Sequence, residues 1–217
     1  MPEASRFFTR RAALAAGVAW LALPGLALPA RAAELIPTPA QSEGPFYPVE
    51  FPPETDWDLV RMGGAAQPAL GTIAYIEGRI LDRNGKAVPR ARVEIWQCDA
   101  KGRYRHPGDA RGPRDEEFQG FGRVDTADDG AYQFRTIRPV AYPGRTPHIH
   151  FAVLAPGAAR FVTQMYVAGE PLNKRDFLLN SVRDQKARER LIVPLAPTDA
   201  ESGALRGRFD IVLPVAL

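Results

Sequence analysis

Residues 73–85 read IAYIEGRILDRNG and carry the first strong strand signal of this 217-residue chain. The part from 73 to 82 is rich in β-branched and aromatic side chains, which favour an extended strand, and Asn84-Gly85 suits a tight hairpin turn. Short segments of the same kind, separated by turn residues, follow at 91–97, 123–125, 132–137, 148–154, 161–167 and 208–213. Their spacing predicts an all-β fold, built as an antiparallel β-sandwich of the prealbumin-like kind.

The segments between these strands indicate where a site would be built. Residues 33–70, 103–122 and 138–147 are rich in proline and glycine and are expected to form long loops. Only residues 184–191 suggest a helix, and it is short. No repeat or linker divides residues 33–217, so we expect a single domain. Because sites are commonly built from long loops on a rigid sandwich, we expect the chemistry around residues 100–165.

The excess positive charge of the chain lies at its beginning. There are 28 lysines and arginines against 25 acidic residues, and residues 1–32 account for the whole difference. This segment ends a basic stretch with Arg10-Arg11, continues with an apolar run over 12–28 and closes with small residues, which predicts a twin-arginine export signal. The apolar run is too short and too interrupted for a stable membrane span. We therefore expect a periplasmic or secreted protein, and no nucleic-acid partner.

Two histidines stand on one predicted strand. His148 and His150 are two residues apart, so both imidazoles point to the same face and can bind one metal ion. The chain has three histidines and one cysteine. A three-histidine zinc site would need His106, and a ferrous site with two histidines and one carboxylate would need a distant acid. A copper or zinc protein with a histidine pair stays an alternative, although further ligands are scarce.

Tyrosines supply the remaining anionic candidates. Tyr104 and Tyr142 lie in the predicted loops, the second of them six residues before His148. A phenol has an unperturbed pKa of about 10, so it binds well only to a strong Lewis acid that stabilises the phenolate. Ferric iron is such an acid, and tyrosinate is a known iron ligand. These residues therefore favour a ferric site.

A family resemblance covers residues 36–213, nearly the whole of the chain after the predicted signal. It rests on seven stretches: TPAQSEGPFYP (38–48), GRILDRNG (78–85), VEIWQ (93–97), GRYRHP (102–107), FRTIRP (134–139), RTPHIHF (145–151) and TQMY (163–166). In this order they resemble the intradiol ring-cleavage dioxygenases, and most closely the catalytic beta chains of the protocatechuate 3,4-dioxygenases. The resemblance implies a β-sandwich with long active-site loops.

The resemblance also implies a metal and residue roles. It implies one non-haem Fe(III) per chain, with the ligands Tyr104, Tyr142, His148 and His150. Arg145 matches a family arginine that stabilises negative charge on the substrate, and Gln164 matches a glutamine on the substrate side. Tyr142 would additionally act as a base that accepts a substrate proton. Cys98 and His106 are expected to be structural.

The implied reaction is the cleavage of a catechol-type aromatic by O₂, giving a cis,cis-muconate-type dicarboxylate. The substrate stays open, since only Pro143 and Gly144 separate Tyr142 from Arg145, where the protocatechuate enzymes have a longer insertion containing tryptophan. Catechol, protocatechuate, hydroxyquinol and bulkier catechols are candidates, and a homo-oligomer is compatible with the sequence. The alternative is a non-enzymatic prealbumin-like binding module, which explains the strands but not the tyrosines and histidines together.

Overall fold

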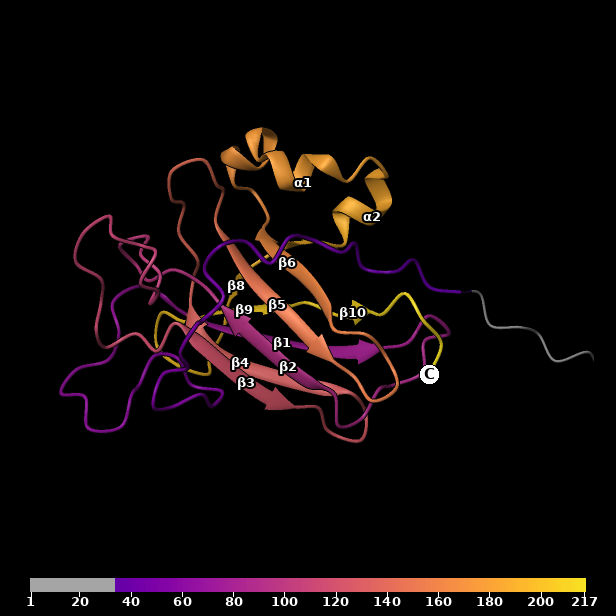
Figure 1. Ribbon diagram of the computed structural model, residues 1–217, viewed down its shortest axis with the longest axis horizontal. Helices are drawn as coiled ribbons and strands as arrows, with labels where there is room; N and C mark the ends of the chain where they lie inside the picture. Colours follow the sequence, from indigo (N-terminus) through magenta and orange to yellow (C-terminus); the bar gives the residue numbers. More distant parts are fainter. Residues whose placement is uncertain (1–33) are drawn as a thin grey trace, which may run out of the picture. The chain divides into compact units, whose positions relative to one another are not determined.

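Two five-stranded sheets form the part of the chain that the computed structural model describes, residues 34–217 (Figure 1). The export signal predicted over residues 1–32 lies outside the described residues. The first sheet contains β1 (Ile73–Leu81), β4 (Ala131–Ile137), β8 (Ala196–Pro197), β9 (Leu205–Arg208) and β10 (Ile211–Val212). The second sheet has the order β3 (Phe121–Asp125), β2 (Arg92–Trp96), β5 (His148–Leu154), β6 (Phe161–Val167) and β7 (Ile192–Val193). The predicted all-β class is confirmed.

The sheets are mixed, whereas the sequence predicts an antiparallel sandwich. The long pairings β1–β4, β2–β3, β2–β5 and β5–β6 are antiparallel. The pairs of β1 with β9 and β10, and of β6 with β7, are parallel. These parallel strands are two to four residues long and come from the last quarter of the chain, which returns along the sheet edges after the helical segment. Such short pieces carry almost no alternation, so the sequence pattern indicates only the segment 208–213 among them.

The predicted last strand, 208–213, contains β10 and the last residue of β9, and residues 209–210 between them are not part of a strand. Both strands lie along the same edge of β1, and the interruption falls at Phe209 and Asp210. The amide of Phe209 still donates to the carbonyl of Glu77, at 2.8 Å. Gly78 permits this close approach, because a Cβ there would lie 2.0 Å from the carbonyl oxygen of Phe209.

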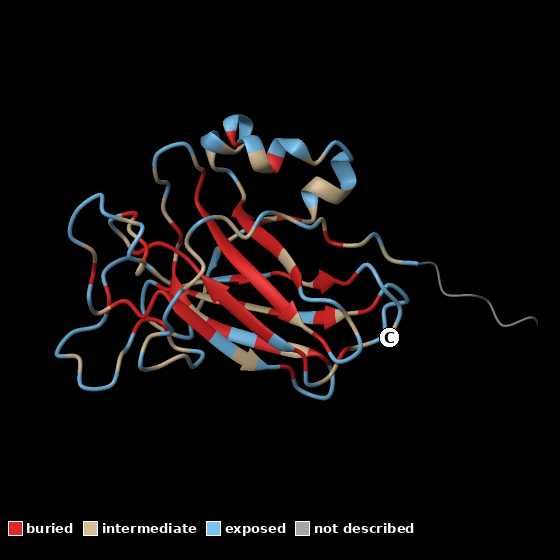
Figure 2. Cartoon of the chain, in the orientation of Figure 1, coloured by how far each residue is buried: buried red, intermediate tan, exposed pale blue. Residues whose placement is uncertain are grey.

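The core lies between the two sheets. On β2, Val93 and Ile95 face this core, and Glu94 and Trp96 face the opposite side, as the alternation predicts. On β5, the inner face carries Ile149, Phe151 and Val153. Figure 2 shows that β5 is buried along almost its whole length. The outer face of the second sheet is therefore covered at β5, whereas Arg92, Arg123 and Asp125 on the same face of β2 and β3 are exposed.

Residues 34–51 form part of this cover, crossing the outer face of the second sheet (Figure 1). The amide of Gln41 donates to the carbonyl of Val162 at 2.9 Å, and the Thr163 hydroxyl donates to the carbonyl of Pro39 at 2.8 Å. Both contacts tie the segment to β6. Side chains on the outer face of β5 and β6 are thereby enclosed between the sheet and this segment.

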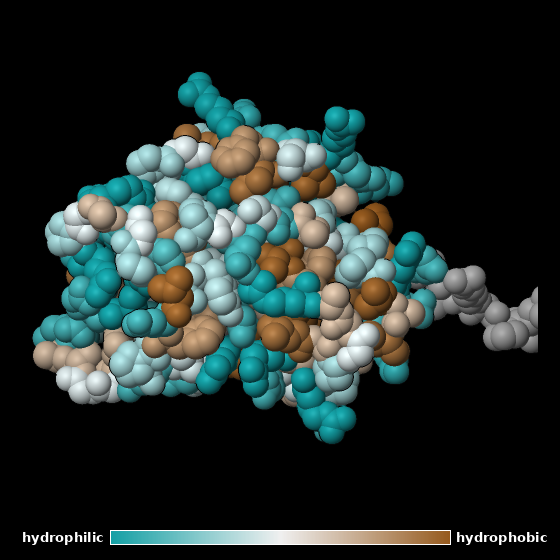
Figure 3. All heavy atoms as spheres, in the orientation of Figure 1, coloured by the Kyte–Doolittle hydropathy of each residue, from teal (hydrophilic) through white to brown (hydrophobic). Residues whose placement is uncertain are grey.

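Three short helices follow β6. They are the 3₁₀ helix η1 (Pro171–Arg175), α1 (Phe177–Ser181) and α2 (Gln185–Glu189). The predicted helix over 184–191 corresponds to α2, and α1 and η1 were missed because five-residue helices have too few turns for a period to show. Figure 3 shows apolar atoms at the surface over these helices, at the top of the view. Within residues 34–217, no helix combines the length and apolar character needed to cross a membrane.

Candidate metal centre and active site

The two histidines of β5 point to the outer face of the second sheet, as their spacing predicts. His148 and His150 are both buried, and their Nε2 atoms lie 3.2 Å apart. Ile149, between them, packs in the core on the other face. The Nε2 atoms of both rings therefore point to the same place on the outer face of the sheet.

Burial keeps both imidazoles neutral. Burial and the positive charge of Arg145 lower the pKa of His148 to about 3. Burial and the neighbouring His148 hold the pKa of His150 well below its ordinary value. The Nδ1 atom of His148 lies 2.6 Å from the carbonyl oxygen of Thr146, which places the ring proton on Nδ1 and leaves the Nε2 lone pair available. A neutral imidazole with a free lone pair is the form that binds a metal.

Tyr104 reaches the same point from the loop between β2 and β3. The carboxylate of Asp99 folds the start of this loop by accepting two backbone amides, at 2.8 and 2.9 Å. The carboxylate of Asp109 accepts the amide of Tyr104 at 2.8 Å. The phenol ring is buried and stacks on Phe46, with ring centroids 4.6 Å apart. The loop therefore holds Tyr104 by its backbone, and Phe46 of the covering segment holds its ring.

Tyr142 comes from the loop between β4 and β5 and is held by a tight turn. Pro143 and Gly144 are its central residues, and a backbone hydrogen bond of 2.9 Å closes it onto the Tyr142 carbonyl. Gly144 has a φ of 84°, which a type II turn requires at this position. The Tyr142 ring lies edge-on to that of Tyr104, with centroids 5.6 Å apart, and its Oη is 3.5 Å from Nε2 of His148.

This donor set fits ferric iron. The hydroxyl of Tyr104 is buried without a hydrogen-bond partner among residues 34–217, an arrangement that costs about 1–3 kcal/mol unless a ligand satisfies it. Burial raises the pKa of both phenols, and at Tyr142 the charge of Arg145 opposes this rise. Each phenolate therefore needs a strong cation beside it. Two phenolates and two neutral imidazoles are ligands that ferric iron accepts.

The alternative ligands do not join this group. His106 is part-exposed, accepts a hydrogen bond from the amide of Gly108 and lines a separate surface hollow. Cys98 is buried, with its thiol 3.7 Å from the carbonyl oxygen of Val140. Within the described part of the chain, no three His, Cys, Asp or Glu side chains lie close enough to hold a metal ion. Residues 34–217 therefore offer no conventional zinc site.

Arg145 is anchored beside the four candidate ligands by a buried ion pair. Its Nε donates to Oδ2 of Asp176 at 2.8 Å, and the two side chains are 8% and 0% exposed. The same carboxylate oxygen accepts the amide of Thr146 at 3.1 Å. Asp176 also caps α1 by accepting the amides of Leu178 and Leu179. One carboxylate thus joins the loop that precedes the histidines to the helical segment.

Gln164 lies behind Arg145. Its Oε1 accepts a hydrogen bond from Nη2 of Arg145 at 2.6 Å, and its Nε2 donates to the carbonyl of Ser42 at 2.7 Å. The hydroxyl of Tyr166 lies 3.0 Å from the same Oε1 and 2.8 Å from Oε1 of Gln41. Gln164 is fully buried and does not line the neighbouring cleft. In this position it orients the guanidinium of Arg145.

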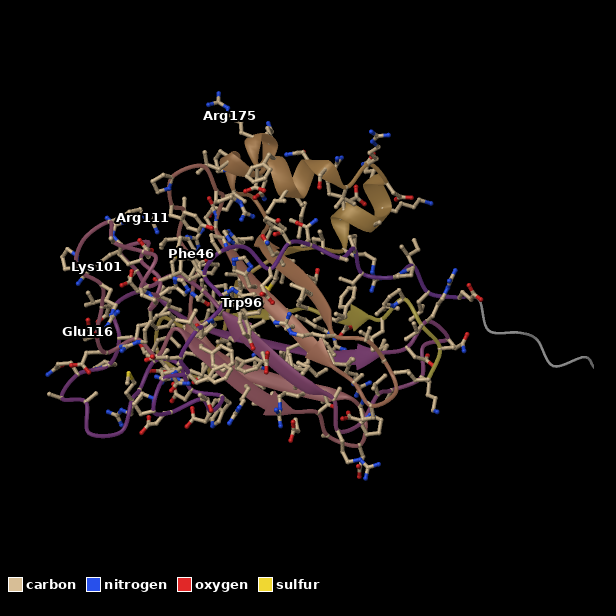
Figure 4. All side chains as sticks on the ribbon, viewed as in Figure 1. Phe46, Trp96, Lys101, Arg111, Glu116 and Arg175 are labelled. Atoms are coloured by element: carbon tan, nitrogen blue, oxygen red, sulfur yellow. The ribbon has the colours of Figure 1, made fainter. Side chains whose placement is uncertain are left out.

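A cleft of about 240 Å³ opens next to these residues. Tyr142 and Arg145 line it, together with Leu172, Arg175 and Asp176 of the helical segment. A cavity of roughly 150 Å³ accommodates benzene, so this space is sufficient for an aromatic ring. Figure 4 labels Phe46 and Trp96, which pack around the centre, and Arg175, which extends from η1. The cleft gives small molecules access to Tyr142.

Comparison with known protein families shows to which family the chain belongs. The sequence model of a family described as "Dioxygenase" matches residues 42–215. The beta chain of protocatechuate 3,4-dioxygenase from Burkholderia cepacia is 40% identical over 179 residues, which cover 78% of this chain and 76% of that protein. The chain belongs to the intradiol dioxygenase family. The predicted resemblance is thereby confirmed, and the relatives are named as dioxygenases of protocatechuate, hydroxyquinol or catechol, which are oxidoreductases.

Other relatives of this dioxygenase are longer. A hydroxyquinol 1,2-dioxygenase from Corynebacterium glutamicum is 34% identical over 81% of this chain and 63% of that protein. Among solved structures, the dioxygenase domain of a carbohydrate-binding fusion protein from Streptomyces sp. SirexAA-E is 30% identical. Its TM-score is 0.63, and the match covers 83% of this chain and all of that one. The chain spans less than two thirds of the length of several curated relatives, including that hydroxyquinol enzyme.

The sequence predicts the four ligand candidates and Arg145, and the structure brings these residues together at one site. The sequence does not predict the residues that hold these side chains in position. Asp176 is the clearest omission, since its signal was only a helix-capping type of residue before a short apolar run. Its pairing with Arg145 spans 31 positions and depends on the tertiary fold. Trp96 was placed on the correct face of its strand, yet nothing in the sequence indicated that it stacks on a ligand candidate.

Proposed function

We propose that this dioxygenase binds one non-haem Fe(III) ion and uses O₂ to cleave a catechol-type aromatic between its two hydroxyl-bearing carbons. The ligands would be Tyr104, Tyr142, His148 and His150, and the product would be a cis,cis-muconate-type dicarboxylate. One observation carries the proposal: two phenols and two neutral imidazoles converge on one face of the sheet, beside a cleft that takes an aromatic ring.

The protons of catechol must leave before both its oxygens can bind a metal. Ferric iron, when bound, supplies the Lewis acid that holds the catecholate and promotes its reaction with O₂. Tyr142 lines the cleft, so its phenolate oxygen is placed to accept one of these protons and become a neutral phenol. Tyr104 is fully buried and stacked on Phe46, which suits a ligand that stays in place.

Arg145 supplies a fixed positive charge at the cleft. Asp176 and Gln164 hold its guanidinium in one orientation through hydrogen bonds of 2.8 and 2.6 Å. A preorganised cation stabilises the negative charge that develops on substrate oxygens, with little reorganisation during the reaction. In this proposal Arg145 acts on the substrate, and Gln164 is a positioning residue.

The proposed substrate class is catechols, with no single compound assigned. The relatives are named for protocatechuate, hydroxyquinol and catechol, and the chain covers only part of several of them. The two-residue turn at 143–144 adds few atoms to one side of the cleft. Bulkier catechols are therefore candidate substrates as well. Neither nucleic acid nor a membrane span has a part in this function.

Metal analysis and product analysis test the proposal together. Purified protein should contain one iron per chain and be red-brown from charge transfer between tyrosinate and Fe(III). Incubation with a panel of catechols should consume O₂ and yield ring-opened dicarboxylates, identified by mass spectrometry. Protein that stays colourless after anaerobic loading with iron, and that cleaves no catechol, would contradict both the ligand set and the activity.

We also propose that residues 1–32 direct export by the twin-arginine route, so that the enzyme acts in the periplasm or outside the cell. The support is the order of basic, apolar and small residues in that segment. Replacing Arg10 and Arg11 together by lysine should abolish export and cleavage, measured by cell fractionation and N-terminal sequencing. Arg6→Lys is the matched control and should leave export intact. Export of the double variant at the normal rate would contradict the assigned route.

A further inference from the structure

An exposed rim of the helical segment borders the cleft. We call it the η1–α1 rim and define it as Leu172, Arg175 and Phe177. Leu172 and Phe177 are 43% and 66% exposed and belong to the few large hydrophobic residues at the described surface. Leu172 and Arg175 line the cleft, and the ring of Phe177 lies 5.7 Å from the guanidinium carbon of Arg145. The rim is therefore continuous with the proposed active site.

The rim is presented by a rigid base. Between its members lie Asn173 and Asp176, whose side chains point inward. Asn173 Oδ1 accepts the hydroxyl of Thr146 at 2.8 Å, and its Nδ2 donates to the carbonyl of Val167 at 2.8 Å. Asp176 caps α1 and pairs with Arg145, as described above. Because the inward residues are fixed to the ligand loop and to β6, the outward ones keep a constant position at the cleft.

The chemistry of the rim is amphipathic. Its two apolar side chains flank Arg175, which forms no ion pair with any of the described residues. Figure 4 shows that the side chain of Arg175 extends away from η1 toward solvent. The space next to Gly144, which also lines the cleft, is open, because a Cβ added to Gly144 would meet no atom within 4 Å. An occupant of this place would have an apolar part next to the cleft and a negative group farther out.

We propose that the η1–α1 rim is a subsite for the side chain of a para-substituted catechol, in which an apolar spacer ends in a carboxylate. This inference rests on the proposed function, since the catechol ring would occupy the cleft at Tyr142. A carboxylate attached directly to the ring would stay inside the cleft near Arg145. A spacer of two or three carbons would lie against Leu172 and Phe177 and bring the carboxylate to Arg175.

The size of the rim favours a small molecule over a protein. A stable protein interface buries about 800 Å² on each partner, which is far more than two apolar side chains and one cation supply. Burial of a few methylene groups, at about 0.8 kcal/mol for each, together with one partly exposed charge pair, is enough to rank substrates. The rim therefore acts on selectivity, and the ring-cleaving chemistry stays with the metal centre.

Four substrates separate the two parts of the subsite. They are catechol, 4-propylcatechol with the spacer alone, 3,4-dihydroxybenzoate with the charge alone, and 3-(3,4-dihydroxyphenyl)propanoate with both. We expect the last to have the highest kcat/KM, about fivefold above 4-propylcatechol and above the benzoate. Arg175→Ala should reduce the preference for the propanoate over 4-propylcatechol by about three- to fivefold. Phe177→Ala should reduce the preference for 4-propylcatechol over catechol by a similar factor.

Controls make each outcome decisive. Arg183→Ala removes an exposed arginine of the same segment that does not line the cleft, and should leave all preferences unchanged. Calorimetry with 3-(4-hydroxyphenyl)propanoate and 4-propylphenol measures the subsite without turnover, and the propanoate should bind more tightly to the wild type but not to Arg175→Ala. If catechol is cleaved while the four substrates differ by less than about twofold, the subsite is overturned and the proposed function stands. An altered oligomeric state of Phe177→Ala with unchanged preferences would likewise overturn it, in favour of a subunit contact.

Discussion

The indole of Trp96 lies parallel to the imidazole of His150, with ring centroids 4.9 Å apart and planes inclined by 8°. The two residues are direct neighbours across β2 and β5. Tyr47 contacts the indole edge-on at 5.0 Å. His148 is oriented differently, by its hydrogen bond to Thr146, whereas Nδ1 of His150 is buried without a partner among residues 34–217. Metal-bound histidines usually take their orientation from such a hydrogen bond, so in the proposed iron site stacking on Trp96 would orient His150 instead.

Replacement of Trp96 should therefore affect iron binding as well as stability. Trp96→Leu removes the stack and leaves a cavity, which should lower the free energy of unfolding by about 3 kcal/mol. Without the stacked indole, the imidazole of His150 can rotate, so we expect iron to dissociate at least tenfold faster. Trp96→Phe keeps an aromatic face and should restore most of the iron retention. Chemical denaturation and iron release to a chelator measure the two effects.

A core variant separates these effects. Phe134 is fully buried in the first sheet, away from the metal centre, and Phe134→Leu should destabilise the protein without faster iron release. If Phe134→Leu and Trp96→Leu lose iron equally fast at equal stability, Trp96 has only a packing role.

Tyr104→Phe should lower iron affinity without lowering the stability of the metal-free protein. The Tyr104 hydroxyl is buried and unpaired within the described chain, so its removal relieves a cost of about 1–3 kcal/mol in the metal-free protein. We expect the metal-free variant to be as stable as the wild type or more stable, while iron affinity falls by at least a hundredfold. Thermal unfolding without metal and iron titration followed by visible absorption are the measurements.

Tyr132→Phe is the matched control. Its hydroxyl is also buried, but it donates to the carbonyl oxygen of Phe209. Removal of this hydroxyl leaves that carbonyl unpaired and should cost about 1–3 kcal/mol of stability, with normal iron binding. A Tyr104→Phe protein that keeps full iron content and colour would show that this residue is not a ligand.

Asp176→Asn should destabilise the protein and remove part of its pH dependence. The variant leaves Arg145 buried without a counter-charge, which should cost about 3 kcal/mol at neutral pH. Burial by itself would raise the pKa of Asp176, but hydrogen bonds from Arg145 and from backbone amides hold this pKa below its ordinary value. A carboxyl whose pKa is lower in the folded state contributes stability above about pH 4, and this contribution is lost as the pH falls further.

The stability difference between wild type and Asp176→Asn should therefore be largest at neutral pH and shrink below about pH 4. Urea denaturation at a series of pH values measures it. Asp184→Asn is the control, because Asp184 caps the exposed helix α2 and asparagine is an equally good capping residue. A difference that stays constant down to pH 3 would show that the charge of Asp176 contributes nothing to folding.

The sequence predicted the six long strands to within two residues, and it did so because their alternation reflects burial. Segment 148–154 was bounded correctly although both its faces are buried, since its β-branched and aromatic residues are flanked by proline-containing loops. The short strands β7 to β10 follow from the packing of the returning chain against β1 and β6. The predicted strand 208–213 is interrupted at Phe209, whose carbonyl lies close to Gly78, 131 residues earlier, and no local pattern reports such a contact.

The residues of the candidate site likewise divide into those that the sequence predicts and those that it does not. The histidine pair is visible because its spacing is set by one strand, and Tyr104 and Tyr142 are visible through their residue type and the family resemblance. Their supports are contacts between distant segments: Asp176 with Arg145, Trp96 with His150, and Gln164 with Ser42. Each pair lies on elements that meet only after the sheets have formed. The sequence therefore predicted the groups that do chemistry better than the groups that position them.

Tyr142→Phe should slow substrate binding while the iron stays bound. Tyr142 lines the cleft and is the proposed acceptor of a catechol proton, whereas Tyr104, His148 and His150 are buried and would remain as the proposed ligands. Loss of a positioned base typically costs a factor of 10² or more, so we expect the rate of catechol binding to fall about a hundredfold. Stopped-flow absorption measures this rate, and iron analysis checks the metal. Tyr75→Phe removes a hydroxyl on β1 of the first sheet that donates to Glu201, and should leave the rate unchanged. Normal binding kinetics in Tyr142→Phe would exclude Tyr142 as the proton acceptor, even if turnover were lost.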